Sequence, residues 1–336
     1  MRRDVQDRLI SQLAEFLDNG ETTMVDSERL NPVSEYCHPD RHAQERTELF
    51  RTQPIVVGYG SQLPAPGDQF VDDLSDWKVV LTRTTDGRVR GQVQDEASGQ
   101  LVDIAVQERH GIVWAVLAPG ASIDVADYLG PDLDAEFTSF GLGDYVVERT
   151  HRFTERINWK SVIDGFLENY HVRYLHADTL ARFLRTNVHV YDPFGRHARL
   201  AVIKTTFDKV RHLPVAEYDP LRHMSVVYHL FPNTIISWVN DHFEAWTSFS
   251  EARRPGFSAT QLTLLTRPDM VDKHEFWDRS MKTILEVIPA EDFEMARLMQ
   301  QGLRAQAQTH QVFGRNEGPL QQFHAQLDSV LGPSPD

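Results

Sequence analysis

The sequence of 336 residues predicts an α+β protein, and three observations support this fold class. Short β-branched runs separated by turn residues fill positions 54–117. Longer strand patterns return at 145–157 and again from 187 to 267. Helical patterns follow at 270–331. Runs of strands followed by helices, without regular alternation, are typical of an antiparallel sheet covered by late helices.

The N-terminal 120 residues divide into two predicted units. Positions 3–18 and 41–51 have helical spacing, so we expect an N-terminal helical segment over 1–50. Over 51–120 we expect a small antiparallel β unit, with Asp86-Gly87 as one hairpin signal. Its strand-like runs are PIVVGYG, WKVVLTR, RVRGQVQ, LVDIAVQ and GIVWAVL.

The remaining residues, 121–336, are predicted to form one larger domain. A loop rich in Asp and Gly, with a short helix near 124–129, leads into it. Strands are expected at 145–157, 187–192, 198–206, 224–231, 234–240, 242–250 and 259–267. Helices are expected at 270–287, 290–308 and 317–331.

Composition excludes several classes of protein. The net charge of −15 argues against a nucleic-acid partner, which requires a concentrated basic surface. No run reaches the length of a membrane span. The single cysteine, Cys37, excludes an internal disulfide and fits a cytoplasmic protein. It also excludes a cysteine-ligated iron–sulfur cluster within one chain, because such a cluster needs at least two cysteines.

The stretch 158–176, NWKSVIDGFLENYHVRYLH, contains a candidate metal site. Glu168 lies about one helical turn before His171, and His176 follows five residues later. Five residues of an ideal helix separate two side chains by about 140°. The helix therefore ends or distorts after His171, or it contains a π-type bulge. The alternative is that these are two ordinary surface histidines among the 15 in the chain.

A third ligand must come from a distant element, because two histidines of one helix cover only one side of an ion. Asp292 is the strongest candidate. It lies in IPAEDFEMARLMQQGL, where an acidic first turn follows Pro289. The alternative is that Glu291 and Asp292 only complement the helix dipole.

Several motifs resemble the Rieske non-heme iron oxygenases, the ring-hydroxylating oxygenase α-subunit family. They are NWK with DGFLENYHVRYLH, YHLFPNTIISW, AEDFEMARLMQQGL and FGRNEGPLQQFHAQL, in that order. The resemblance implies a helix-grip (SRPBCC/START-like) catalytic domain. It also implies that His171, His176 and Asp292 hold one mononuclear Fe(II). Glu168 would take the place of the bridging acid that links the iron to the electron-donating cluster of a neighbouring subunit, and Glu at this position resembles a subset that includes quaternary-ammonium oxygenases.

The chain departs from the family in its small β domain. Family members carry a Rieske [2Fe–2S] cluster on one Cys-x-His and one Cys-x-x-His pair. Here the corresponding stretch, QVQDEASGQLVDIAVQERHG, has no cysteine, and His110 is its only histidine. Residues 51–120 thus resemble a truncated, degenerate Rieske-like domain without cluster ligands. We expect no [2Fe–2S] cluster of its own.

The resemblance implies a catalytic oxygenase component. It would use O2 to hydroxylate or oxidatively demethylate a small organic substrate, aromatic or otherwise. Electrons would come from a Rieske-bearing or ferredoxin-type donor on another polypeptide, within a homo- or hetero-trimer or hexamer. Two alternatives are an iron enzyme independent of an external donor and a non-catalytic partner subunit.

Four residues are candidates for the substrate pocket: Tyr174, Phe231, Trp238 and His242. Aromatic side chains over the iron could bind an apolar substrate, and His242 could orient a polar group. Aromatic residues at strand and helix spacing are more often part of the core.

Overall fold

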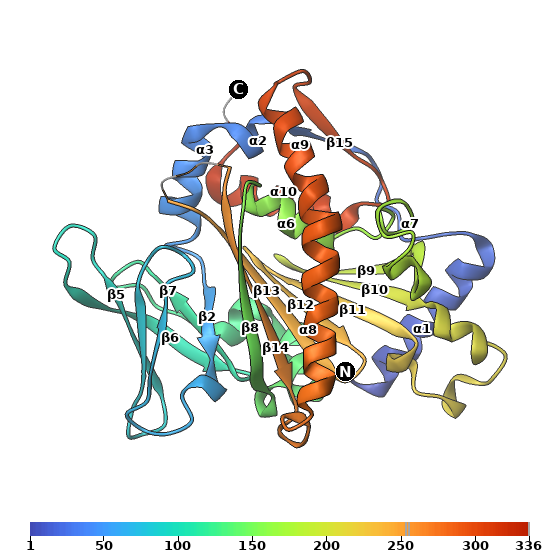
Figure 1. Ribbon diagram of the computed structural model, residues 1–336, viewed down its shortest axis with the longest axis horizontal. Helices are drawn as coiled ribbons and strands as arrows, with labels where there is room; N and C mark the ends of the chain where they lie inside the picture. The colour runs from blue at the N-terminus through green and yellow to red at the C-terminus, as the bar shows by residue number, and fades with distance from the viewer. Residues whose placement is uncertain (253, 255, 335–336) are drawn as a thin grey trace.

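The computed structural model describes residues 1–252, 254 and 256–334, and in this part of the chain the strands form three antiparallel sheets. Figure 1 shows a large central sheet, a small sheet on one side of it and a two-stranded ribbon above it. Helices cover both faces of the large sheet. The expected α+β class is confirmed.

The large sheet has the strand order β8-β14-β13-β12-β11-β10-β9. Every neighbouring pair is antiparallel, and short connections join most consecutive strands. Its strands are β8 (Val146–Glu155), β9 (Leu184–Phe194), β10 (His197–Lys204), β11 (Met224–Leu230), β12 (Thr234–Val239), β13 (His242–Ser250) and β14 (Ser258–Thr266).

The small sheet has the order β2-β7-β6-β5-β4-β3. Its strands are β2 (Ile55–Tyr59), β3 (Gln69–Asp72), β4 (Val79–Arg83), β5 (Val89–Gln94), β6 (Leu101–Arg109) and β7 (Ile112–Val116). Five of the six were expected. The short edge strand β3 was not predicted, because its four residues, QFVD, are too few to show a clear alternation of apolar and polar side chains.

The N-terminal residues, expected as a separate segment, pack on the larger unit. Helix α1 (Arg3–Asn19) buries Leu9, Ile10 and Leu13 against strands β9 and β10. Strand β1 (Arg29–Pro32) pairs with β15 (His310–Phe313), which lies near the other end of the chain.

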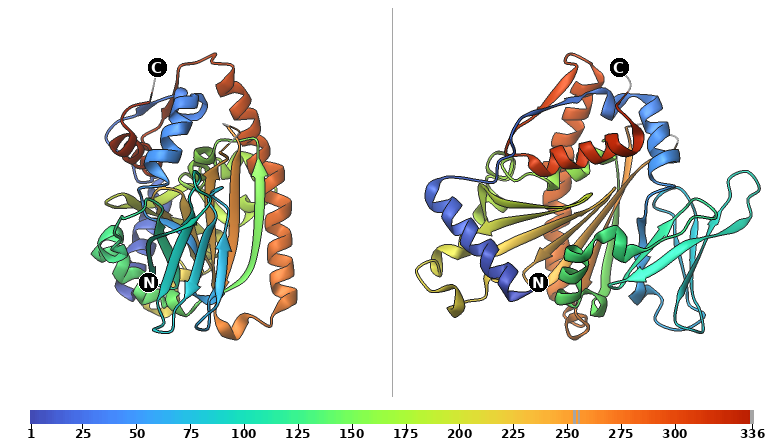
Figure 2. Two further views of the ribbon diagram at one scale, coloured as in Figure 1. Left: turned by 90° about the vertical axis from the view of Figure 1, so that its left-hand side faces the viewer. Right: turned by 180° about the vertical axis from the view of Figure 1, so that it is seen from behind.

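The helices lie on both sides of the large sheet. Figure 2 shows α1 and the helices that directly follow the small sheet on one side of the large sheet, and the long orange helical rod of residues 274–304 on the other. The bounds are α2 (Ser34–Cys37), α3 (Pro39–Gln44), α4 (Val125–Leu129), α5 (Pro131–Phe140), α6 (Trp159–Phe166), α7 (Val172–Leu175), α8 (His274–Ile288), α9 (Glu294–Arg304) and α10 (Gly318–Leu331). Two π-helical turns, η1 (Glu45–Leu49) and η9 (Pro289–Phe293), adjoin α3 and α9. Short 3-10 turns are η2 (Gly60–Gln62), η3 (Leu142–Asp144), η4 (Leu180–Arg182), η5 (Thr205–Lys209), η6 (Val215–Glu217), η7 (Pro220–Arg222) and η8 (Pro268–Met270).

Two hydrophobic cores form on the two faces of the large sheet. Ile235 belongs to the core under α6, α8 and α10, and the next residue, Ile236, belongs to the core under α1 and α5. Successive residues of a strand point to opposite faces, so one strand supplies both cores. The first core continues into the small sheet through residues such as Val79 and Leu81, which joins the two sheets into one packed body.

Two helical predictions need correction, and one helix was not predicted. The helix expected to end or distort after His171, or to contain a π-type bulge there, ends earlier, at Phe166, and a separate short helix, α7, follows. The helix expected at 290–308 begins as a π turn and becomes α-helical at Glu294. Helix α5 was missed, because its Asp- and Gly-flanked sequence was interpreted as a loop.

Candidate metal centre

The helix that leads to the site is fixed at its first turn. The Asn158 side chain accepts a hydrogen bond from the Lys160 backbone N–H at 2.9 Å, which caps the helix. The Trp159 indole donates to Glu45 Oε2 at 2.8 Å, and the Lys160 ammonium pairs with the same carboxylate. All three side chains from α6 are buried. Buried hydrogen bonds and an ion pair therefore fix the first turn of α6 in place.

The end of α6 determines where the candidate ligands point. After Phe166 the chain leaves the helix, so residues 167–171 do not continue its face. His171 precedes the single turn α7 and His176 follows it. The break removes the 140° separation that an unbroken helix would impose, and the two imidazole rings lie 5.3 Å apart between centroids.

Asp292 reaches the same place from the C-terminal helices. Helices α8 and α9 form one continuous rod across the sheet, visible in orange in Figure 1, and the π turn η9 lies within it. Asp292 is in this π turn. π turns inside helices occur often at functional sites, because the extra residue redirects side chains.

The structure brings His171, His176 and Asp292 together. One ligand atom of each lies within 4.8 Å of the others. Asp292 Oδ1 is 3.1 Å from His176 Nε2 and 3.8 Å from His171 Nε2. Ligands at about 2.1 Å from an octahedral ion, at right angles to each other, are separated by about 3 Å. Both Nε2 atoms thus point to one small volume beside one carboxylate.

The chemistry of this group fits a mononuclear Fe(II). Two imidazoles and one carboxylate are the donor set of facial-triad iron sites. The second carboxylate oxygen, Asp292 Oδ2, is buried without a hydrogen-bond partner in the described residues. A buried carboxylate oxygen without a partner is costly, and a bound cation would compensate it.

The other ring nitrogens face carboxylates. His171 Nδ1 hydrogen bonds to Glu168, whose second oxygen accepts the His171 backbone N–H at 3.1 Å. His176 Nδ1 lies 2.5 Å from Glu291 Oε2. A carboxylate at Nδ1 favours the tautomer with its proton there, which leaves Nε2 free for a metal.

Electrostatics at His176 follow from its two acidic neighbours. The ring is 1% exposed, and burial alone would lower its pKa. Hydrogen bonds and charge from Asp292 and Glu291 outweigh burial, so the pKa of His176 is raised above its usual value. The site therefore favours positive charge near Nε2, which is also where a metal ion would add it.

Glu168 is partly exposed, as are two of the three ligands. Its side chain is 12% exposed, and those of His171 and Asp292 are 22% and 25% exposed. Of the three ligands, only His176 is fully buried. Sequence spacing had already placed it one turn before His171.

The structure does not bring the four expected pocket residues together. Tyr174 points to solvent, and Phe231 belongs to the core on the α6 face. Trp238 belongs to the core on the opposite face. His242 is buried beside Trp277, 5.1 Å between ring centroids, and is ion-paired with Asp241. The four do not line one cavity.

Two residues near the site were not identified from the sequence as contributors. Glu291 contacts His176, and Thr179 Oγ1 donates to Glu291 Oε2 at 2.7 Å. The only signal in the sequence was the acidic pair Glu291-Asp292. This pair made Asp292 a candidate ligand, with a helix-dipole effect of both residues as the alternative.

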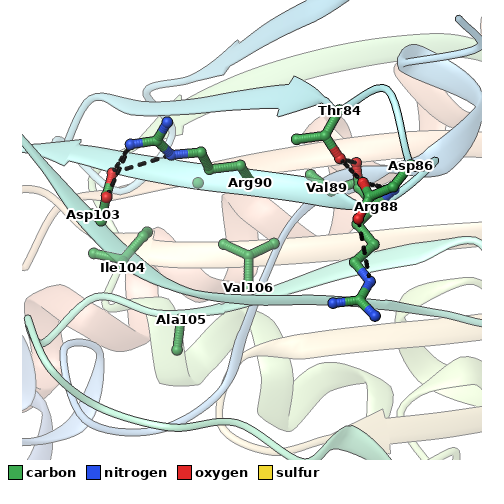
Figure 3. A pocket seen from close by; sticks show the side chains of 10 residues that line it. Thr84, Asp86, Arg88, Val89, Arg90, Asp103, Ile104, Ala105 and Val106 are labelled. Carbon is green, nitrogen blue, oxygen red and sulfur yellow. Dashed lines mark hydrogen bonds and ion pairs between the residues drawn. The ribbon is translucent and has the colours of Figure 1, made fainter. Parts of the chain in front are cut away.

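The small sheet has a compact turn where cluster-binding loops would be expected. Asp95 accepts hydrogen bonds from the Ser98 backbone N–H and hydroxyl, and these close the β5–β6 hairpin. Figure 3 shows an open depression on the same hairpin, where Arg90 pairs with Asp103. Cys37 lies elsewhere, in α2, with its sulfur 3.6 Å from the Gln300 amide. In the described chain, this depression is away from the three candidate ligands.

Comparison with known proteins identifies a family. Residues 142–332 match the model of the ring-hydroxylating α subunit, catalytic domain. The comparison with curated proteins finds no significant match. No helix in the described part of the chain is both long and apolar enough for a membrane crossing.

Solved structures show the same fold at low identity. The quaternary ammonium Rieske monooxygenase CntA, in complex with an inhibitor, is 13% identical with a TM-score of 0.72, covering 94% of this chain and 98% of that one. Another structure with the same coverage and identity and a TM-score of 0.71 is described in terms of carnitine oxidation by gut microbiota and inter-subunit electron transfer. Naphthalene 1,2-dioxygenase from Rhodococcus sp. is 14% identical with a TM-score of 0.67, covering 99% of this chain and 100% of that one.

Proposed function

The chain belongs to the ring-hydroxylating oxygenase α-subunit family, and we propose that it is a catalytic component that receives electrons from another polypeptide. Membership makes it an iron-dependent oxygenase of the Rieske type. The proposal concerns which residues hold the iron and where the electrons come from.

His171, His176 and Asp292 are the proposed iron ligands, and their convergence within 4.8 Å is the observation that carries the proposal. A facial set of three protein ligands leaves up to three positions on Fe(II) for O2, water and nearby substrate. The chain's own contribution is to fix those ligands. Glu168 orients His171, and the burial of His176 excludes bulk water from one side.

The cysteine count supports a source of electrons outside this chain. The sequence contains one cysteine, and a Rieske cluster needs two. We therefore propose a Rieske-bearing or ferredoxin-type donor in trans, which approaches at Glu168. A homo- or hetero-trimer or hexamer would be consistent with such transfer, since one similar structure is described in terms of inter-subunit electron transfer. The single cysteine also supports a cytoplasmic location.

The substrate is proposed to be a small organic molecule. Aromatic hydrocarbons and quaternary ammonium compounds are the first classes to test, because two similar solved structures carry those names. Hydroxylation and oxidative demethylation are the two expected outcomes.

Iron content tests the proposal directly. Protein produced with iron supplied is expected to contain about one iron per chain and no Rieske absorption bands. His171→Ala, His176→Ala and Asp292→Ala are each expected to lose the iron. Glu294→Ala and His310→Ala are matched controls, since both side chains lie outside the site and are exposed. Equal iron in the triad variants and the controls would contradict the ligand assignment.

Turnover tests the electron source. With O2, substrate and a reduced ferredoxin-type or Rieske-type donor, product should form, and omission of the donor should abolish it. Product from O2 and substrate alone would instead favour an iron enzyme independent of a donor. A folded chain that binds no iron would favour a non-catalytic partner subunit.

A further inference from the structure

One imidazole, that of His176, is held between two consecutive acidic residues. Its Nε2 lies 3.1 Å from Asp292 Oδ1, and its Nδ1 lies 2.5 Å from Glu291 Oε2. The ring is 1% exposed, so water does not compete for either nitrogen. The two carboxylates therefore define the position of both ring nitrogens.

The local backbone makes this arrangement possible. Glu291 and Asp292 lie in the π turn Pro289–Phe293, where the helix is wider than an α-helix. In an ordinary α-helix, adjacent side chains point about 100° apart. In this π turn both carboxylates contact one ring, on opposite edges. The feature that delivers Asp292 to the metal site thus also delivers Glu291.

Glu291 is itself held from a second direction. Thr179 Oγ1 donates a hydrogen bond to Glu291 Oε2 at 2.7 Å. Thr179 follows His176 by three residues, and its hydroxyl also lies 3.4 Å from the His176 carbonyl oxygen. The carboxylate is therefore fixed relative to the ring that it contacts, rather than free to rotate.

We propose that Glu291 is a positioning residue for the metal centre, which holds His176 with its proton on Nδ1 and its Nε2 lone pair directed at the iron. This inference rests on the proposed role of His176 as a ligand. A carboxylate that accepts from the non-ligating nitrogen fixes the ring and increases its basicity toward the metal. Loss of such a partner typically raises the dissociation constant of the metal by about 10- to 100-fold.

The test measures Co(II) binding to metal-free protein by visible absorption, which reports both affinity and ligand geometry. Glu291→Ala is expected to weaken binding about 10- to 100-fold and to change the ligand-field bands. Glu291→Gln keeps an oxygen that can accept from Nδ1 and should recover part of the affinity. Thr179→Val should give a smaller loss, because it frees the carboxylate without removing it.

Glu294→Gln is the matched control for Glu291→Gln. Glu294 is one turn away on α9, is 55% exposed and pairs with Arg297 instead of a histidine. Its Co(II) affinity and spectrum should equal those of the unmodified protein. Identical affinities and spectra for Glu291→Ala, Glu291→Gln and Glu294→Gln would overturn the inference.

The His176→Ala variant separates this inference from the proposed function. If His176→Ala abolishes Co(II) binding while the Glu291 variants bind normally, only the positioning role fails. If the unmodified protein binds no Co(II) at the triad, the ligand assignment fails, and the positioning role fails with it. If Glu291→Ala does not fold, Glu291→Gln and Thr179→Val decide, since both keep the side-chain volume.

Discussion

Tyr36 joins polar groups on α6, the helix that leads to the metal centre, and on α10. Its hydroxyl donates to Asp164 Oδ2 at 2.6 Å and lies 3.1 Å from His324 Nε2, which is 3.0 Å from Asp164 Oδ1. Burial, followed by the charge of Asp164, raises the pKa of Tyr36 well above its usual value. The phenol therefore stays protonated and acts as a donor. Asp164 lies on α6, so this network links the N-terminal α2 and the closing α10 to the helix that leads to the ligands.

Removal of this hydroxyl should destabilise the protein. Tyr36→Phe leaves the Asp164 carboxylate short of one charge-assisted hydrogen bond, which is worth about 1.5–3 kcal/mol. Urea unfolding should show this loss in the free energy of unfolding. Tyr174→Phe is the matched control, since Tyr174 is 75% exposed, and it should change stability by less than about 0.5 kcal/mol. Equal stabilities for the two variants would refute the role of Tyr36.

Residue-scale contacts around the site were only partly predictable. Histidine spacing and an acidic turn made the three triad residues candidates, and the resemblance of their motifs to the Rieske oxygenases implied that they act together. The pairing of Glu291 with His176 was not predicted, because it depends on a π turn that places adjacent residues on one ring. The four pocket candidates were grouped by residue type, whereas side-chain direction separates Phe231 from Trp238 onto opposite faces of the sheet.

At the scale of elements, α6 depends on a buried ion pair with a distant π turn. Lys160, at the second position of α6, is fully buried and pairs with Glu45 of η1. The same carboxylate accepts from the Trp159 indole. Two buried charges that satisfy each other are tolerated, but one left alone is strongly destabilising.

Lys160→Met should therefore cost about 3–5 kcal/mol, because it leaves Glu45 as an unpaired buried carboxylate. Thermal unfolding of the metal-free protein measures this without reference to activity. Lys282→Met is the matched control, since the Lys282 side chain is 72% exposed, and it should be nearly neutral. Adding Glu45→Gln to Lys160→Met should restore part of the loss. A double variant no more stable than the single one would count against the ion pair as the cause.

Regular elements were more predictable than the broken helix at the site. The strands expected at 242–250 and 259–267 match β13 and β14 to within one residue, and the helices expected at 3–18 and 317–331 match α1 and α10 equally closely. The end of α6 at Phe166 was missed, because the apolar spacing continues through Leu167 and Tyr170 even though the backbone does not. The β1–β15 pairing joins residues 278 to 284 positions apart, such as Pro32 with His310 and Arg29 with Phe313, and no local pattern encodes it.

At the scale of the whole molecule, buried histidines govern the response to acid. Burial lowers the pKa of His189 and His197 to about 4 and that of His229 to about 3. In the unfolded chain these groups titrate near 6.5. Below pH 6.5 the unfolded state therefore takes up protons first, so stability is lost as pH falls toward 4. Burial raises the pKa of Asp72 to about 7 and also raises that of Glu317, and both groups act in the opposite direction. Burial lowers the pKa of His223 and of the Met1 amino group, which adds to the loss of stability.

The free energy of unfolding should thus decrease from pH 6.5 to pH 4.5. Each histidine contributes at most about 1.4 kcal/mol per pH unit over this interval. Urea titrations at several pH values measure the slope. His229→Gln should reduce the slope of the free energy of unfolding against pH, even if the variant is less stable than the unmodified protein. His310 is exposed, so His310→Gln should leave this slope unchanged. A stability that is constant over this pH interval would contradict the assignment of these histidines.

The metal centre lies within the segment that matches the family model, whereas the small sheet lies outside that segment. Two ligands flank α7, and the third lies in the π turn between α8 and α9. The small sheet packs on the same core but ends in a closed hairpin turn at Asp95–Ser98. We propose that this chain has one iron site and takes its electrons from another polypeptide.

Anaerobic reductive titration of the oxidised, iron-loaded protein tests this proposal, because it counts the electrons that each chain takes up. One mononuclear iron without a cluster should take up one electron per chain, with about one iron per chain by metal analysis. His171→Ala should take up none. Uptake of a second electron, together with about three irons per chain, would show a cluster within this polypeptide. That result would contradict the proposal that the chain holds a single iron and no cluster.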